Sequence, residues 1–70
     1  MTSLTLQIAS VPDREKAVAE IWFGNDQVAE ISNEENNAAL IQIFSAPDGG
    51  VWSFNLSELE KILREAKANL

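Results

Sequence analysis

A four-residue sequence recurs in this chain ten positions later: Val18-Ala19-Glu20-Ile21 returns as Val28-Ala29-Glu30-Ile31. Between the two copies stands Gly24-Asn25-Asp26, which is typical of tight turns because these residue types tolerate unusual backbone angles or bond to their own turn. Two strand-like segments around a turn predict an antiparallel hairpin. We place its strands at residues 17–23 and 27–32.

The register of the hairpin decides which side chains share a face, because successive side chains of a strand point to opposite sides. A two-residue loop at Asn25-Asp26 would set Ile21 opposite Glu30 and mix apolar with charged positions. We prefer a three-residue loop, or a register shifted by two. The preferred pairs are Glu20 with Glu30, Ile21 with Ala29 and Trp22 with Val28.

The preferred register gives the hairpin two unlike faces. One face is almost wholly apolar and should lie against a helix. Its members are Ala17, Ala19, Ile21, Phe23, Ala29 and Ile31. The other face mixes acidic, aromatic and small residues, and its members are Val18, Glu20, Trp22, Val28, Glu30 and Ser32.

The segments on either side of the hairpin also have the pattern of strands. Apolar alternation predicts a strand at residues 3–9, another at 38–45 and a short last strand at 51–54. The last two are joined by Ala46-Pro47-Asp48-Gly49-Gly50, which is the clearest turn sequence in the chain.

A helix is predicted at residues 57–68. Ser57 and Glu60 have the spacing of a capping box, in which each side chain bonds an end amide of the other's residue. Apolar residues follow at the three- and four-residue spacing of an amphipathic helix. These are Leu59, Ile62, Leu63, Ala66 and Leu70.

Together these elements predict one α+β domain over residues 1–70. It is a four- to five-stranded antiparallel β-meander with one C-terminal α-helix packed on one face. Trp52 and Phe54 are expected to cap the core beneath the helix. The opposite face of the sheet must then meet water or a partner.

The charges of the chain are unevenly distributed. Eleven acidic residues stand against five basic ones, for a net charge of -6, and no Lys or Arg occurs from Ala17 to Glu60. Such a surface repels nucleic acid and anionic membranes and attracts basic partners. The alternative is that the charge only keeps a small protein soluble.

The composition excludes several kinds of catalytic and metal site. The chain has no His, Cys or Tyr, so it cannot form a Ser-His-Asp or Cys-His system or a zinc site of His and Cys. The segment 33–37 lacks the residue spacing of a calcium loop. A carboxylate pair of Glu20 and Glu30 remains a remote alternative, because a small meander offers little depth for a cleft. We expect no enzymatic activity and no cofactor.

Nothing in the sequence points to export or to a membrane. The N-terminus lacks a basic stretch followed by a long apolar run, and no segment approaches the roughly 20 apolar residues of a membrane span. We expect a soluble cytoplasmic protein.

The mixed face of the hairpin is the predicted binding site. Glu20 opposite Glu30 is mildly destabilising unless solvent screens the pair, and a Lys or Arg of a partner would neutralise both. Trp22 on the same face has the character of an interface anchor, or alternatively covers the edge of the sheet. The predicted partner-binding residues are Glu20, Trp22, Asp26, Glu30, Glu34 and Glu35.

The order of these parts resembles the small immunity proteins that accompany bacterial toxins, particularly those of contact-dependent growth inhibition systems. The residues that carry the resemblance are 18–23, 28–32 and 48–54, leading into 59–70. The resemblance implies a cytoplasmic, non-enzymatic protein that binds and blocks one cognate toxin domain, often a basic nuclease. It supplies no site residues, because no motif defines these proteins.

A second interpretation assigns the chain to a different class. It would be a small adaptor or structural module that self-associates into a homodimer through its open sheet face. Burial of Trp22 in a stable dimer would favour this interpretation over the first.

Overall fold

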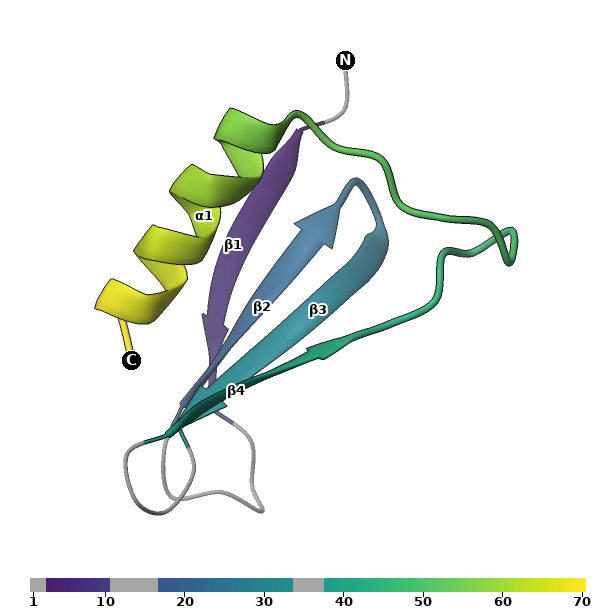
Figure 1. The fold of residues 1–70 in the computed structure, drawn as a ribbon. Coiled ribbons are helices and arrows are strands. Elements are labelled where there is room, and N and C mark those ends of the chain that lie inside the picture. The colour runs from purple at the N-terminus through teal and green to yellow at the C-terminus, as the bar shows by residue number, and fades with distance from the viewer. Residues whose placement is uncertain (1–2, 11–16, 34–37) are drawn as a thin grey trace.

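The computed structural model describes residues 3–10, 17–33 and 38–70. Within these residues, four antiparallel strands form one sheet in the order β1-β2-β3-β4, and a single helix packs on it (Figure 1). The predicted α+β meander with one helix is therefore confirmed. The elements are β1 Leu4–Ala9, β2 Val18–Phe23, β3 Asp26–Asn33, β4 Ala39–Ile43 and α1 Leu56–Ala68.

The hairpin of β2 and β3 has the predicted central register but a different turn. Ile21 pairs with Ala29 and Glu20 with Glu30, as expected. The loop, however, contains only Gly24 and Asn25, because Phe23 already pairs with Asp26. Gly24 has a φ of 65°, a left-handed conformation that glycine adopts without a steric penalty. The preferred three-residue loop was wrong, and the shorter loop is reconciled with the register by a bulge.

The bulge places Val28 differently from the prediction. The register shifts between Ile21 and Trp22, so Trp22 pairs with Gln27 and Val28 is the extra residue of β3. Val28 is only 5% exposed and belongs to the buried core cluster, instead of lying on the mixed face. An extra residue in one strand changes which side later residues face, which alternation alone does not reveal.

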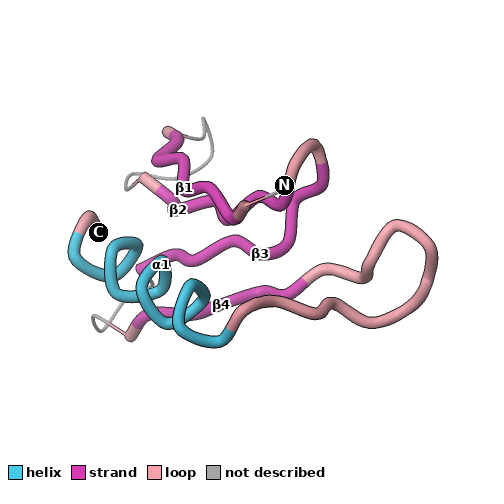
Figure 2. The backbone as a smooth tube through the Cα atoms, turned by 90° about the horizontal axis from the view of Figure 1, so that it is seen from above, coloured by secondary structure: helices cyan, strands magenta, loops and turns pink. Residues whose placement is uncertain are grey.

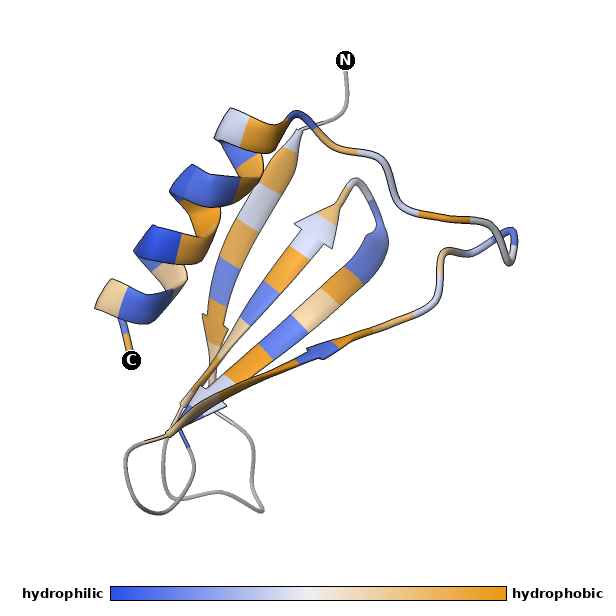
Figure 3. Ribbon diagram, viewed as in Figure 1, coloured by the Kyte–Doolittle hydropathy of each residue, from blue (hydrophilic) through white to orange (hydrophobic). Residues whose placement is uncertain are grey.

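The core lies between α1 and the first three strands. Its buried members in the sheet are apolar residues of β1, β2 and β3, and Ile62 and Ala66 of α1 close it from the helix side. The apolar stripe of α1 and the alternating bands along the strands are visible in Figure 3. The apolar hairpin face does meet the helix, as predicted. The sheet members of the cluster are Leu4, Ala19, Ile21, Val28, Ala29 and Ile31.

The helix begins one residue earlier than predicted, and its cap differs. Asn55 is the N-cap, and its side-chain oxygen accepts a hydrogen bond of 3.0 Å from the backbone N–H of Glu58. Ser57 lies inside the helix, so the predicted capping box of Ser57 and Glu60 was wrong. Asn is as good an N-cap as Ser, and the amide that it satisfies lies three positions later, as is usual for an N-cap.

The segment between β4 and α1 contains no strand, so the short strand predicted at 51–54 was wrong. This segment projects from the end of the sheet (Figure 2). Trp52 and Phe54 nevertheless pack against the core as expected, in edge contacts with Phe23 at centroid distances of 6.5 and 5.1 Å. The Trp52 indole donates a hydrogen bond of 2.7 Å to the Phe44 carbonyl. Contacts between aromatic rings, instead of strand pairing, thus attach this segment to the core.

The helix covers the sheet unevenly. It contacts β1 and β2, whereas every residue of β4 is exposed. Ile41 and Ile43 pair with Ile31 and Ala29 and therefore share the helix side of the sheet, yet they are 47% and 68% exposed. The sheet thus has one edge beside the helix and one edge open to solvent.

Candidate binding face

The side of the sheet away from α1 carries a row of four polar side chains that crosses all four strands. Gln7 lies opposite Glu20, Glu20 opposite Glu30, and Glu30 opposite Gln42. Cross-strand neighbours on one face are within contact range of each other. We call Gln7, Glu20, Glu30 and Gln42 the acidic row. Its two central members are both carboxylates.

The acidic row has no basic neighbour within the sheet. None of the four strands contains a Lys or Arg, and the bases of the described residues lie on α1, at Lys61, Arg64 and Lys67. Glu20 and Glu30 are both half-buried, so water screens their repulsion only in part. The two carboxylates therefore form a local concentration of negative charge that the strands themselves do not neutralise.

Trp22 holds one of these carboxylates in position. Its indole N–H donates a hydrogen bond of 3.2 Å to Oε1 of Glu20, two residues earlier on the same face of β2. Ionised carboxylates offer about four acceptor sites, so Glu20 keeps most of its capacity for a cationic donor. Trp22 was predicted as an anchor for a partner, and the structure adds that it orients Glu20.

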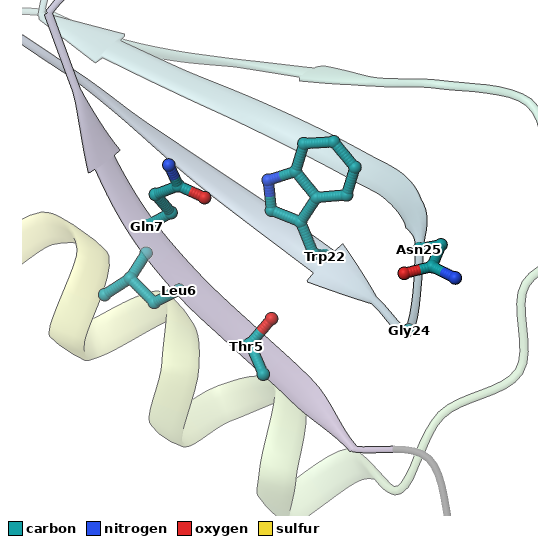
Figure 4. A pocket seen from close by; sticks show the side chains of 6 residues that line it. All are labelled: Thr5, Leu6, Gln7, Trp22, Gly24 and Asn25. Carbon is teal, nitrogen blue, oxygen red and sulfur yellow. The ribbon is translucent and has the colours of Figure 1, made fainter.

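A shallow hollow of about 440 Å³ adjoins Trp22 between β1 and the β2–β3 turn. Figure 4 shows that Trp22 and Gln7 project on the side of the sheet away from α1, so the hollow lies next to the acidic row. It is open to solvent and large enough for a side chain of another protein. Its lining residues are Thr5, Leu6, Gln7, Trp22, Gly24 and Asn25.

The other predicted site residues are not brought to this row. Asp26 pairs with Phe23 and lines a different hollow of about 380 Å³, together with Pro47 and Trp52. Glu34 and Glu35 lie outside the described residues. The structure therefore gathers Glu20, Trp22 and Glu30 and separates Asp26 from them.

Sequence reasoning missed the two glutamines that extend the row. Gln7 and Gln42 stand at positions that alternation places on the same side as Glu20, but uncharged side chains gave no reason to select them. Val18 and Ser32, which alternation places on that side too, are buried. The accessible part of the face therefore centres on Glu20, Trp22 and Glu30.

The described residues contain no cluster of three or more His, Cys, Asp or Glu side chains that could hold a metal ion. In the same part of the chain, no helix is long and apolar enough to cross a membrane. What the acidic row offers chemically is acceptance of hydrogen bonds from cations, since ionised carboxylates accept and do not donate. No protein-family model, curated protein or solved structure matches this chain.

Proposed function

We propose that this chain is a bacterial immunity protein that acts in the cytoplasm, where it binds a basic toxin domain of the nuclease class and neutralises it. The pairing of Glu20 with Glu30 across β2 and β3, on strands without a basic residue, carries the proposal. The contact surface is the acidic row together with Trp22. The protein itself performs no catalysis.

Charge explains why a basic enzyme is a suitable partner. Nuclease surfaces that hold phosphate groups are positive, and an inhibitor of net charge -6 is steered toward them. An Arg of the toxin could bond either carboxylate in a bidentate manner, and such charge-assisted bonds are stronger than neutral ones.

The two opposed carboxylates also favour binding because they slightly destabilise the unbound protein. Like charges directly across two strands cost roughly 0.2–1 kcal/mol, and a cation placed between them removes that cost. Trp22 beside them supplies a large, rigid contact surface of the kind that dominates many interfaces. The same residues would thus be mildly unfavourable alone and favourable in the complex.

The central test replaces both carboxylates by their uncharged isosteres. Glu20→Gln with Glu30→Gln should abolish protection of cells that express the toxin-like protein encoded directly upstream, and should weaken binding of that protein at least tenfold. Glu60→Gln with Glu65→Gln is the matched control, because it removes the same charge from exposed positions of α1. If the two double variants protect equally well, the acidic row is not the contact surface.

A second observation tests the function independently of the site. The proposal requires a neighbouring reading frame whose product is toxic and basic, and which co-purifies with this chain. Its absence would contradict the immunity function, whatever the behaviour of the Gln variants.

A further inference from the structure

The two edges of the sheet are protected to different degrees. At β1, the backbone N–H of Leu4 donates a hydrogen bond of 2.8 Å to Oε1 of Glu58, and α1 packs beside this strand (Figure 1). At the other edge, β4 carries no charged residue, no proline and no bulge, which are common devices against edge-to-edge pairing. The β1 edge is therefore partly protected by α1, whereas the β4 edge is open.

The open edge offers unpaired backbone groups. Phe44 donates its N–H to the Val28 carbonyl, so this residue points its backbone toward β3. Backbone direction alternates along an antiparallel strand, so Ile41 and Ile43 direct their N–H and C=O groups away from β3. Ile41 is also nearly half exposed, and Ile43 is mostly exposed.

We propose that β4 pairs with β4 of a second copy of this chain, which joins the two sheets into one continuous eight-stranded antiparallel sheet. The occupant of the edge is a second copy because residues 38–45 carry no charge in a chain of net charge -6. This strand is where two equally acidic molecules can meet without bringing like charges into contact. The inference does not depend on the proposed function.

Symmetry selects the register of the new pair. A two-fold axis perpendicular to the sheet keeps the helix side of both copies on the same face, so paired residue numbers must both be odd or both be even. With Gln42 opposite Gln42 of the second copy, Ile41 meets Ile43, and Leu40 lies across from Phe44. Shifting by two would set Leu40 against Gln42, so the register centred on Gln42 matches like with like.

The same register aligns the acidic rows of the two copies. The row Gln7, Glu20, Glu30, Gln42 continues through the axis into its symmetry mate. The nearest carboxylates across the axis, Glu30 and its copy, are then three strand spacings apart, about 14 Å. That exceeds the screening length of about 8 Å at physiological ionic strength, so their repulsion is weak. At the other edge, α1 packs beside β1 and Glu58 occupies the backbone N–H of Leu4, so we expect a dimer and no longer assembly.

Cross-linking tests the register in a chain that has no natural cysteine. Directly opposed residues that exchange no hydrogen bonds have Cα atoms about 4.5 Å apart, within the range a disulfide spans. Gln42→Cys should therefore form a disulfide-linked dimer under mild oxidation. Leu40→Cys is the matched control on the same face, because its symmetry mate is displaced by about 14 Å along the strand. Equal cross-linking of both variants, or none of Gln42→Cys, would overturn the register.

Sedimentation velocity tests the dimer itself on the full chain. The unmodified protein should sediment as a dimer, and Ile43→Lys should sediment as a monomer, because the change places a charge within the seam, opposite the apolar Ile41 of the second copy. Val51→Lys is the control: it is the same kind of change at an 87% exposed position outside β4, and it should leave the dimer intact. Circular dichroism checks that both variants fold. A monomer at the highest attainable concentration of the unmodified chain refutes the proposal.

Discussion

Glu58 links β1 and α1, the two described elements that lie farthest apart in the sequence. Its backbone N–H is satisfied by the N-cap Asn55, and its carboxylate accepts from the backbone of Leu4 in β1. An acid in the first helical turn is also favoured by the helix dipole. The predicted capping box would have used the carboxylate of Glu60. The carboxylate that forms a bond is instead that of Glu58, and its partner is the β1 backbone.

Replacement of Glu58 should therefore lower stability more than replacement of another helix acid. Glu58→Ala is expected to reduce the free energy of unfolding by about 1.5–3 kcal/mol, the range for a hydrogen bond to a charged group. Glu60→Ala, at an exposed position, should change it by less than about 0.5 kcal/mol. Urea denaturation followed by circular dichroism measures both. Equal effects would mean that the bond to Leu4 contributes nothing.

Glu30→Gln should change the free energy of unfolding in the opposite direction from Glu58→Ala. It keeps the size of the side chain and removes the charge facing Glu20, so the free energy of unfolding should rise by about 0.2–1 kcal/mol at low ionic strength. The gain should shrink in high salt, where the repulsion is screened. A variant that is more stable and yet binds the proposed partner less well cannot owe its loss of binding to misfolding.

At the level of elements, the bulge at Val28 reconciles a two-residue turn with the pairing of Glu20 and Glu30. The alternation of side chains between the two faces predicted that pairing correctly. It assumed, however, that neither strand contains an extra residue, and this assumption required a three-residue loop. A bulge breaks that assumption, and its core-facing valine is not distinguishable in sequence from a strand residue on the other face. This is why the pairing was predictable and the turn was not.

Deletion of Val28 should remove the bulge and retain the pairing. Gln27 would still lie opposite Trp22 and Ala29 opposite Ile21, since Val28 is the unpaired extra residue. Stability should fall by about 1.5–3 kcal/mol, the contribution of burying one such side chain. Nuclear Overhauser contacts between the backbones of Glu20 and Glu30 would report the register. Their loss would show that the bulge sets the pairing as well as filling the core.

The elements after the hairpin show the limit of local patterns. The helix was predicted to within one residue at its start, because its apolar spacing repeats over several turns. The segment 51–54 has the alternation of a strand but no neighbouring strand to pair with, so its aromatic rings pack on Phe23 instead. Whether a strand-like segment finds a partner depends on chain geometry, which residue types do not encode.

For the whole molecule, the proposed toxin-binding face and the proposed dimer edge, which adjoin at Gln42, should respond oppositely to salt. Raising the ionic strength from 0.1 to 1 M shortens the screening length from about 10 to about 3 Å. Binding of a basic toxin domain should weaken several-fold, because it relies on opposite charges. Self-association through β4 should strengthen, because two copies of charge -6 repel less. Titrations with the proposed toxin partner and sedimentation at both salt concentrations measure the two effects, and a shared direction would contradict the assignment of opposite electrostatics to the two surfaces.

The overall layout followed from sequence because one strongly patterned hairpin and one amphipathic helix dominate a short chain. The shared face of Glu20, Trp22 and Glu30 followed with it, since strand register brings them together. The two glutamines of the acidic row were not selected, because nothing in the sequence distinguishes an uncharged surface residue. The exposure of β4 also could not be predicted, because it depends on which strands the helix reaches.

The bond between Leu4 and Glu58 has a consequence for how the chain acquires its structure. It connects residues 54 positions apart, and α1 follows all four strands in the chain. During synthesis, the β2–β3 hairpin can form early from neighbouring residues, but the apolar side of the sheet stays uncovered until the helix leaves the ribosome. The core is therefore completed only when α1 has been synthesised, and a nascent chain that stalls before α1 leaves the apolar side of its sheet exposed.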